Sequence, residues 1–215
     1  MMPPEWQISE GVVPYPDAVA AMQERVAAIA HHGAREWVWL LQHPPLYTAG
    51  TSASADELLE NTPFPVYETG RGGRYTYHGP GQRVAYVLLN LRARDGDVRA
   101  HIARLEAWVI KALADVGVAA ARREGRIGLW VAAGAREEKI AAIGVRVTRG
   151  VAWHGVAVNV DPDLSHFGAI VPCGLRDYGV TSLRKLGLSA TMAQLDAALK
   201  NNWDAVFQVP LARQG

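Results

Sequence analysis

Cysteine is almost absent from this 215-residue sequence, in which Cys173 stands alone. One cysteine cannot form an internal disulfide, and it cannot anchor a typical structural zinc site. The seven histidines add no CxxC, HxxxH or HExxH spacing, so we expect no metal centre. A chain without a disulfide framework is typical of a reducing compartment.

An excess of charge of one sign and long apolar runs are also missing. Lysine and arginine number 22 against 21 aspartates and glutamates, for a net charge of +1. This balance gives no global attraction to nucleic acid or to a membrane, although arginines cluster locally at 71–83 and 122–126. The run VAYVLL at 84–89 is far too short to span a bilayer, and the N-terminus lacks the pattern of a signal peptide. We therefore expect a cytoplasmic monomer that binds neither nucleic acid nor membrane.

Nucleotide-binding motifs are not found either. GxGxxG at a strand-to-helix junction and GxxxxGK[ST] both fail to occur. Phosphate transfer and NAD chemistry therefore lose support, and we expect no cofactor.

The sequence does contain enough apolar pattern for a core, because 49% of its residues are hydrophobic. Prolines at 3, 4, 14 and 16 predict an extended or irregular segment over 1–16. Strands bunch in the middle of the chain and helices lie at both ends, which favours a single α+β domain over 1–215 with a mixed sheet. Strands are predicted over 37–42, 66–69, 84–89, 127–131, 139–148 and 151–160, and helices over 17–31, 97–116 and from about 191.

End signals set the helix boundaries. Asp17 and Asp97 can cap the first two helices, and Gly33 and Gly117 can end them. The third helix has capping-box spacing from Thr191. The predicted apolar face of the second helix is Val98, Ile102, Leu105, Val109, Ala112, Leu113 and Val116.

Turn signals separate the later strands. The small, charged sequence AAGAREE predicts a turn before the strand at 139, and Arg149-Gly150 predicts a hairpin after it.

The segment 71–82, RGGRYTYHGPGQ, is the most informative stretch of the chain. Its glycines let backbone approach a ligand closely, and its polar and aromatic side chains supply donors, acceptors and flat faces. It predicts a shaped binding loop, with a solvated hairpin tip as the alternative.

Cys173 lies in the sequence IVPCGL, between a proline and a glycine. This setting predicts a thiol on a constrained turn, where the N–H groups of Gly174 and Leu175 can face a developing oxyanion. A buried structural cysteine is the alternative. As a nucleophile the thiol would need a nearby ammonium, imidazolium or helix N-terminus, because only about 3% of an ordinary thiol is ionised at pH 7.

Lys139 is the candidate cation, since it opens the apolar strand KIAAIGV. The charged residues 136–138 before it favour a solvated position instead. Among the histidines, His78 and His154 are the better candidates for a site because each precedes a glycine, whereas His31 and His32 fall at a helix end and His101 inside a helix.

Five segments in this order resemble the octanoyltransferases, the lipoyl(octanoyl) transferases that begin lipoate synthesis on proteins. They are HPPLYTAG (43–50), RGGRYTYHGPGQ (71–82), EKIAAIGV (138–145), HGVAVNV with DLSHF (154–167), and IVPCGL with GVTSL (170–183). The resemblance covers roughly residues 15 to 187. It implies an α+β fold with a larger mixed sheet and a smaller one, like that of biotin and lipoate ligase catalytic domains.

The same resemblance implies an activity and its residues. The donor would be octanoyl-acyl carrier protein, and the acceptors lipoyl domains of 2-oxoacid dehydrogenases and the glycine-cleavage carrier. Cys173 would carry the acyl chain as a thioester, and Lys139 would lower its pKa. The implied substrate contacts are Arg71, Gly72, Gly73, Arg74, Tyr75, Thr76, Tyr77, His78, Ala142, Ile143, Gly144, Gly155, Val156 and Ala157.

These residues suit that chemistry. Small side chains at 142, 144, 155 and 157 on adjacent predicted strands leave room for a narrow apolar slot. Thioester exchange followed by amide formation needs no ATP, in line with the missing nucleotide motifs. Two alternatives stay open: an ATP-dependent lipoate or biotin ligase of the same fold, and a non-catalytic carrier-binding module.

Overall fold

The computed structural model describes residues 2–59, 62–94, 96–134, 136–170 and 178–208. In this part of the chain the strands form an eight-stranded sheet and a three-stranded sheet. The order in the large sheet is β1 (Glu5–Val12), β2 (Trp37–Gln42), β6 (Gln82–Asn90), β10 (Val151–Asn159), β9 (Arg136–Thr148), β8 (Arg126–Ala133) and β7 (Ala121–Arg123), with β11 (Gly179–Val180) paired to β9. The order in the small sheet is β4 (Val66–Glu68), β3 (Leu46–Ala49) and β5 (Thr76–His78).

Both sheets are mixed, which confirms the predicted fold class. In the large sheet β1 pairs with β2 and β11 with β9 in parallel, and the other neighbours are antiparallel. In the small sheet β3 is parallel to β4 and antiparallel to β5. No helix in the described ranges combines the length and apolar character that a membrane span needs.

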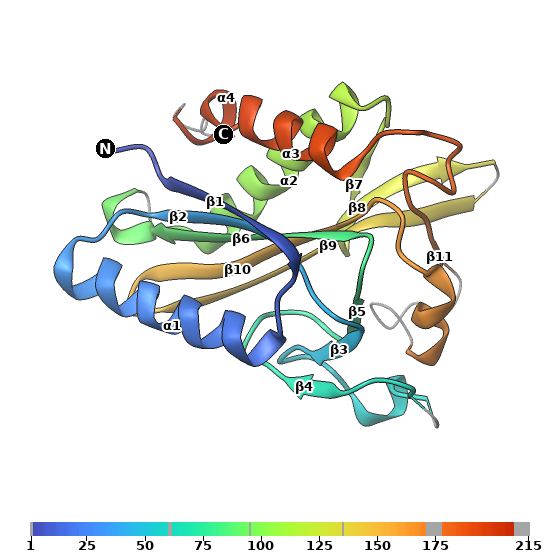
Figure 1. Ribbon diagram of the computed structural model, residues 1–215, viewed down its shortest axis with the longest axis horizontal. Coiled ribbons are helices and arrows are strands. Elements are labelled where there is room, and N and C mark those ends of the chain that lie inside the picture. The colour runs from blue at the N-terminus through green and yellow to red at the C-terminus, as the bar shows by residue number, and fades with distance from the viewer. Residues whose placement is uncertain (1, 60–61, 95, 135, 171–177, 209–215) are drawn as a thin grey trace.

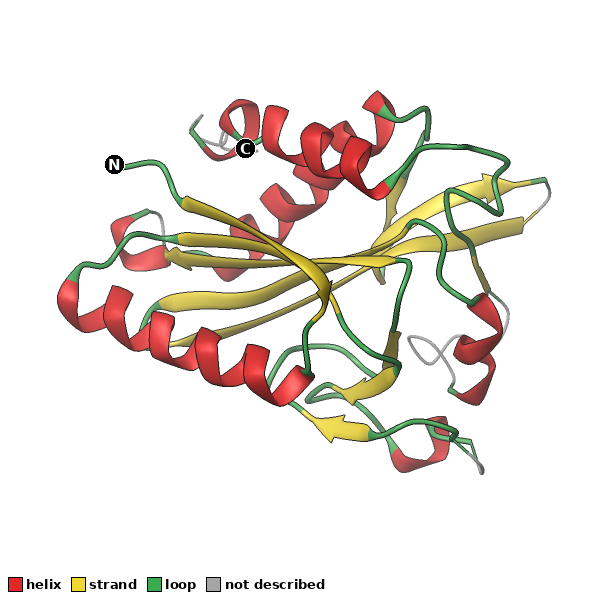
Figure 2. Ribbon diagram, in the orientation of Figure 1, coloured by secondary structure: helices red, strands yellow, loops and turns green. Residues whose placement is uncertain are grey.

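Helices cover both faces of the large sheet (Figures 1 and 2). Helix α1 (Tyr15–His32) lies on one face, and α2 (Val98–Asp115), α3 (Met192–Asn201) and the short α4 (Asp204–Phe207) lie on the other. Strand β6 feeds both cores: Val84, Tyr86 and Leu88 pack on the α1 side, and the residues between them pack on the α2 side. A strand buried on both faces reads as a continuous apolar run, which explains VAYVLL.

The first helix begins two residues earlier than predicted. Pro14 precedes it, and Asp17 falls in its first turn, with no side-chain cap at the N-terminus. The prediction that Asp17 caps this helix was wrong, because Pro16 is tolerated inside the first turn, where N–H groups lack partners. Gly33 ends the helix in the left-handed conformation, as predicted.

The second helix starts as predicted, with the Asp97 side chain accepting hydrogen bonds from two backbone N–H groups. Its buried face is wider than the aliphatic stripe. Trp108 is fully buried and donates from Nε1 to the carbonyl of Leu199 on α3 (2.7 Å), whereas the predicted stripe residue Val98 is exposed. The third helix has the predicted Thr191–Gln194 capping box.

Most of the segment AAGAREE (132–138), which was predicted to be a turn, belongs to strands β8 and β9. Strand β8 runs to Ala133 and β9 starts at Arg136, so the turn is short and contains Gly134. Glu137 belongs to β9 and forms ion pairs with Arg123 on β7 and with Arg126 on β8. The next turn is the predicted hairpin, with positive φ at both Arg149 and Gly150, as a two-residue turn requires.

Candidate functional site

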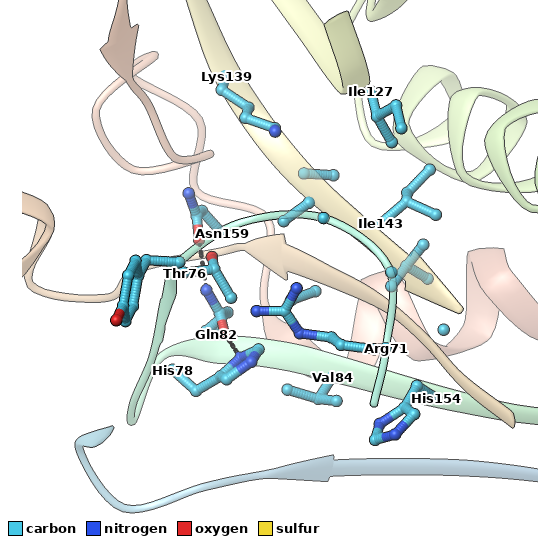
Figure 3. A pocket seen from close by; sticks show the side chains of 18 of the residues that line it. Arg71, Thr76, His78, Gln82, Val84, Ile127, Lys139, Ile143, His154 and Asn159 are labelled. Carbon is cyan, nitrogen blue, oxygen red and sulfur yellow. Dashed lines mark hydrogen bonds between the residues drawn. The ribbon is translucent and has the colours of Figure 1, made fainter. Parts of the chain in front are cut away.

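The glycine-rich segment 71–82 closes over one face of the large sheet and forms a pocket. The pocket has a volume of about 850 Å³, part of it open to solvent. Its floor comes from β6, β9 and β10, and its wall comes from the segment that leads into β5 (Figure 3).

The floor is smooth because small residues lie opposite one another. Gly144 on β9 pairs with Gly155 on β10, and Ala142 pairs with Ala157. A side chain at Gly144 would meet Cδ of Arg71 at 2.9 Å and the Gly72 carbonyl at 3.0 Å. Gly144 therefore leaves room for the wall of the pocket, whereas a side chain at Gly155 would collide with the backbone of Ala85 on β6.

Arg71 fixes the shape of that wall. Its side chain is buried and donates from Nη2 to the carbonyl (2.8 Å) and hydroxyl (2.7 Å) of Thr48 and to the carbonyl of Arg74 (2.9 Å). Further hydrogen bonds run from Nε to the Thr48 hydroxyl and from Nη1 to the Gly72 carbonyl. Gly72 N–H in turn donates to Val145 O on β9 (2.9 Å), so the segment is fixed against the large sheet and is not a solvated tip.

A β-bulge brings Lys139 to the pocket. Trp130 lies opposite Lys139, but the preceding residue Leu129 lies opposite Ala141, so β9 carries one extra residue at Ile140. In regular alternation Ile140 would share the pocket face with Ala142, and Lys139 would point into the opposite core. The bulge reverses this assignment: Ile140 packs in the core on the α2 side, and Lys139 lines the pocket.

Lys139 is buried, with 7% of its surface exposed, and its ammonium lies 5.5 Å from the Trp130 ring centre. The alternative of a solvated lysine is therefore wrong. Gly128 makes room for it, because a Cβ there would lie 2.4 Å from Cε and 2.9 Å from Nζ of Lys139. Figure 3 shows the lysine side chain directed into the pocket, across from Arg71.

Two buried histidines, His78 and His154, line the pocket, and the ring of a third, His43, lies 5.9 Å from that of His78. Burial lowers the pKa of His78 and of His154 to about 3, with Arg71 adding to the effect. Burial likewise lowers the pKa of His43 to about 4, and its Nε2 forms a 2.7 Å hydrogen bond with the hydroxyl of Tyr86. All three are neutral at pH 7. His154 also has a φ of +63°, a strained conformation for a residue with a side chain.

The described pocket lining carries cations and no carboxylate. Arg71, Arg74 and Lys139 line it, and Arg74 forms an ion pair with the buried Glu57. Among the described residues no group of three or more His, Cys, Asp or Glu side chains is placed to hold a metal ion. Such a lining favours bound groups that are, or become, negatively charged.

Cys173 lies outside the described residues, as do Gly174 and Leu175. The described residues on either side of the 171–177 segment do reach the pocket: Phe167 before it and Val180 after it both line the cavity. Val180 lies opposite Lys139 in the parallel pairing of β11 with β9.

Most residues that the sequence singled out lie around this pocket. Lining residues among them are Arg71, Gly73, Arg74, Tyr75, Thr76, His78, Lys139, Ala142, Ile143, Gly144, Gly155, Val156 and Ala157. Tyr77 points away, into a cluster with Tyr47 and Phe167, and Gly72 takes part through its backbone. Gln82 and Asn159 also line the pocket and were not predicted, although Asn159 continues the alternation of 155 and 157 along β10.

Comparison with known proteins identifies the family. The pattern of the lipoyl protein ligase A/B catalytic domain family matches residues 14–203. An octanoyltransferase of Paramagnetospirillum magneticum is 61% identical over 206 residues, which are 95% of this chain and 97% of that protein. One from Maricaulis maris is 60% identical, over 94% of this chain and 91% of its own. The chain belongs to the octanoyltransferases.

Solved structures place this octanoyltransferase in the wider fold. A bipartite lipoate protein ligase from Thermoplasma acidophilum superimposes with a TM-score of 0.74 at 16% identity, covering 99% of this chain and 86% of that one. Lipoate-protein ligase A bound with ATP gives 0.72 at 15% identity, covering 97% and 87%. A biotin acetyl-CoA carboxylase synthetase from Helicobacter pylori gives 0.52 at 9%, covering 94% and 75%. These likenesses confirm the predicted fold.

Substituting Gly128 tests the position of Lys139. We expect Gly128→Ala to lower the octanoyl-transfer rate by about 100-fold, because the new Cβ displaces the ammonium and a displacement near 1 Å is enough for that loss. Gly125→Ala is the matched control, since Gly125 also has positive φ but nothing within 4 Å of its Cβ position. Gly125→Ala costs about 1–2 kcal/mol of stability. Gly128→Ala costs more, because its Cβ also meets the Ala141 carbonyl at 2.6 Å, so the two rates are compared per folded protein. Equal rates for the two variants would contradict this placement of Lys139.

The histidines predict a pH dependence of stability. Each of the three has a pKa lowered in the folded state, so below pH 6.5 the unfolded chain binds protons that the folded protein does not. Stability is therefore full above pH 6.5 and falls as the pH drops toward the folded-state values of about 3 to 4. At pH 5.5 the loss is about 1.4 kcal/mol per histidine, or roughly 4 kcal/mol together.

Urea unfolding at pH 7.5 and pH 5.5 measures this loss. His154→Asn, which tolerates positive φ, should reduce it by about one third. A free energy of unfolding that stays constant between these two pH values would show that the histidines are not buried as neutral groups.

Proposed function

We propose that this octanoyltransferase takes its acyl group from octanoyl-acyl carrier protein, holds it as a thioester on Cys173, and passes it to a lysine ε-amine. The acceptors are lipoyl domains of 2-oxoacid dehydrogenases and the glycine-cleavage carrier. The single cysteine suits a cytoplasmic, reducing site of action. The observation that carries the proposal is a buried lysine in an apolar pocket, paired along the backbone with the strand that follows Cys173.

Both ends of the cysteine segment are anchored next to the pocket. On one side η3 (Leu164–Ala169) is held by Tyr47, whose hydroxyl donates to the His166 carbonyl (2.8 Å), and by a hydrogen bond between Tyr77 and the His166 ring (2.9 Å). On the other side the Thr181 N–H donates to the carbonyl of Lys139 (2.9 Å). These contacts support a meeting of the Cys173 sulfur with the lysine ammonium.

A thiolate–ammonium pair closes the proton balance of the reaction. The Cys173 thiolate attacks the donor thioester; a new C–S bond forms, the carrier's C–S bond breaks, and the leaving thiolate takes a proton from Lys139. The acceptor amine then attacks the Cys173 thioester and gives a proton to the neutral Lys139. The amide leaves, and thiolate and ammonium are restored.

The energy of each step fits a reaction without ATP. Exchange of one thioester for another is nearly isoenergetic, and conversion to an amide is downhill. Arg71 and Lys139 place positive charge at the pocket, where the tetrahedral oxyanions form. The six methylenes of an octanoyl chain gain about 0.8 kcal/mol each on burial over the glycine and alanine floor, or roughly 5 kcal/mol.

Cys173→Ser tests the covalent step. We expect this variant to fold and to lose transfer, and intact-mass analysis of the unaltered protein with octanoyl carrier should show one octanoyl adduct on Cys173. An ATP-dependent ligase would keep its activity in Cys173→Ser, and a carrier-binding module would show no adduct. Either result would refute the proposed function.

Lys139→Met tests the role of the ammonium. We expect the alkylation rate of Cys173 to rise with pH around an ordinary thiol pKa of about 8.5, and the unaltered protein to react at lower pH, because the cation favours the thiolate. Lys185→Met is the control, since Lys185 is exposed and pairs with Glu138 beside the same strand. Superimposable alkylation profiles for Lys139→Met and the unaltered protein would exclude the pair.

The end of the pocket at His154 is expected to limit the length of the acyl chain that binds. His154 lines the pocket beside Gly155, at the end of the β9–β10 floor away from Lys139. We expect His154→Gly to shift the preferred donor to longer chains, because it removes a wall and relieves a positive φ. In contrast, Gly144→Val should shorten the preferred chain, because it presses on Arg71.

Competition among acyl-carrier thioesters of six to twelve carbons, read by mass, measures the shift. Arg149→Gly is the matched control, since Arg149 has a φ of +54° but lies in the hairpin turn and does not line the pocket. If His154→Gly and Arg149→Gly keep the same length profile, this end of the pocket does not hold the acyl tail.

A further inference from the structure

A line of hydrogen bonds between buried polar groups connects the glycine-rich loop to the backbone of Lys139. Its central part is drawn in Figure 3, where His78, Gln82 and Asn159 are joined in series. His78 Nδ1 bonds Gln82 Oε1 (2.7 Å), and Gln82 Nε2 donates to Asn159 Oδ1 (3.0 Å). The members of the line, in order, are Arg71, Thr48, His78, Gln82, Asn159 and Thr181.

The line has a direction that its ends determine. Asn159 Nδ2 donates to the Thr181 carbonyl (2.9 Å), so Asn159 Oδ1 faces Gln82 as the acceptor. Gln82 Nε2 also donates to the Tyr77 carbonyl, which leaves Gln82 Oε1 to accept the Nδ1 proton of His78. His78 is then neutral, in agreement with its pKa of about 3, which burial lowers.

The other end of the line begins at the arginine. His78 Nε2 lies 3.4 Å from the Thr48 hydroxyl, which can donate to it while accepting two hydrogen bonds from Arg71. Each donor therefore points away from Arg71 and toward Thr181. Turning any one amide around would oppose two donors or two acceptors, so the members hold one another in place.

The far end of the line holds the segment next to Lys139. Strand β11 has only two residues, Gly179 and Val180, so its backbone pairing with β9 is short. Asn159 adds two links to the residues that follow: its side chain binds the Thr181 carbonyl, and its own carbonyl accepts from Leu183 N–H (3.1 Å). Asn159, Thr181 and Leu183 are all buried, and a hydrogen bond left unmade in the protein interior costs more than one left unmade in water.

We propose that Gln82 and Asn159 are positioning residues for acyl transfer. They connect the loop that covers the acyl pocket to the chain that follows Cys173, and so fix that chain against Lys139. This inference rests on the proposed thioester at Cys173. Its consequence is that the reactivity of the thiol depends on two amides that need not touch the reacting atoms.

Asn159→Ala tests the proposal, because it removes the hydrogen bond from Gln82 and the hydrogen bond to the Thr181 carbonyl. We expect kcat for octanoyl transfer to fall by about 10-fold to 100-fold, with KM for the octanoyl carrier changed less than about twofold. The pH profile of Cys173 alkylation should move to higher pH. Gln82→Met, which keeps the length of the side chain and loses the amide oxygen and nitrogen, should move kcat and the alkylation profile in the same direction.

Asn90→Ala is the matched control, because Asn90 ends strand β6 away from the pocket and its side chain accepts from Arg92 N–H. A loss of packing alone would lower the melting temperature and leave the alkylation profile in place. Asn159→Asp keeps the volume and the acceptor for Gln82 but loses the donor to Thr181, and it replaces the alanine variant if that variant does not fold.

The outcomes separate this inference from the proposed function. If the unaltered protein forms the Cys173 adduct but Asn159→Ala and Gln82→Met keep its kcat and alkylation profile, the positioning role is refuted and the thioester stands. If no adduct forms in the unaltered protein, both are refuted. A drop in kcat with a shifted alkylation profile in both variants, and neither change in Asn90→Ala, supports the positioning role.

Discussion

The β-bulge at Ile140 decides which side chains of strand β9 face the pocket, and the arrangement of the site follows from it. On the far side of the bulge Ala142 and Gly144 face the pocket and give it a flat floor. On the near side Lys139 takes the position that an apolar side chain would occupy in a regular strand. One extra residue therefore lets a single strand supply both the apolar floor and the cation.

That cation lies in a pocket whose described lining also contains Arg71 and Arg74 and contains no carboxylate. Lys139 lies across Gly128 and near the Trp130 ring, and the guanidinium of Arg71 is saturated by carbonyl and hydroxyl oxygens. The three buried histidines are neutral and add no charge. Positive charge that is fixed in place at a pocket is suited to a thiolate and to the oxyanion of acyl transfer.

The parts of this structure that the sequence predicted depend on local pattern. The Asp97 cap, the Gly33 ending, the Arg149-Gly150 hairpin and the apolar run of β6 are each determined by residues close together in the chain, and each was found. The motifs in their order pointed to the family. Residue chemistry alone left Lys139 undecided between solvent and site, because burial depends on strands far away in sequence.

The features that the sequence did not predict depend on the register of the strands and on pairing between segments far apart in the chain. Strand β5 lies inside the glycine-rich segment and forms only because β3 runs beside it. The bulge at Ile140 has no composition signal, since KIAAIGV reads as a regular strand. Gln82 lies in the motif RGGRYTYHGPGQ and Asn159 in the motif HGVAVNV. Their side chains can form a hydrogen bond only because β6 and β10 are neighbours in the sheet.

The fold and the chemistry are separable in this family. The two lipoate ligases that superimpose on this chain share 15–16% of its residues, so the same fold forms from very different side chains. An apolar slot for an acyl chain asks only for small residues on two neighbouring strands and a wall above them. Activation of the acyl group asks for more, because a thiol must be ionised and then aligned with a proton acceptor. In the function proposed above, Lys139 at the bulge, with Val180 opposite it, meets that second demand, and the floor of alanine and glycine meets the first.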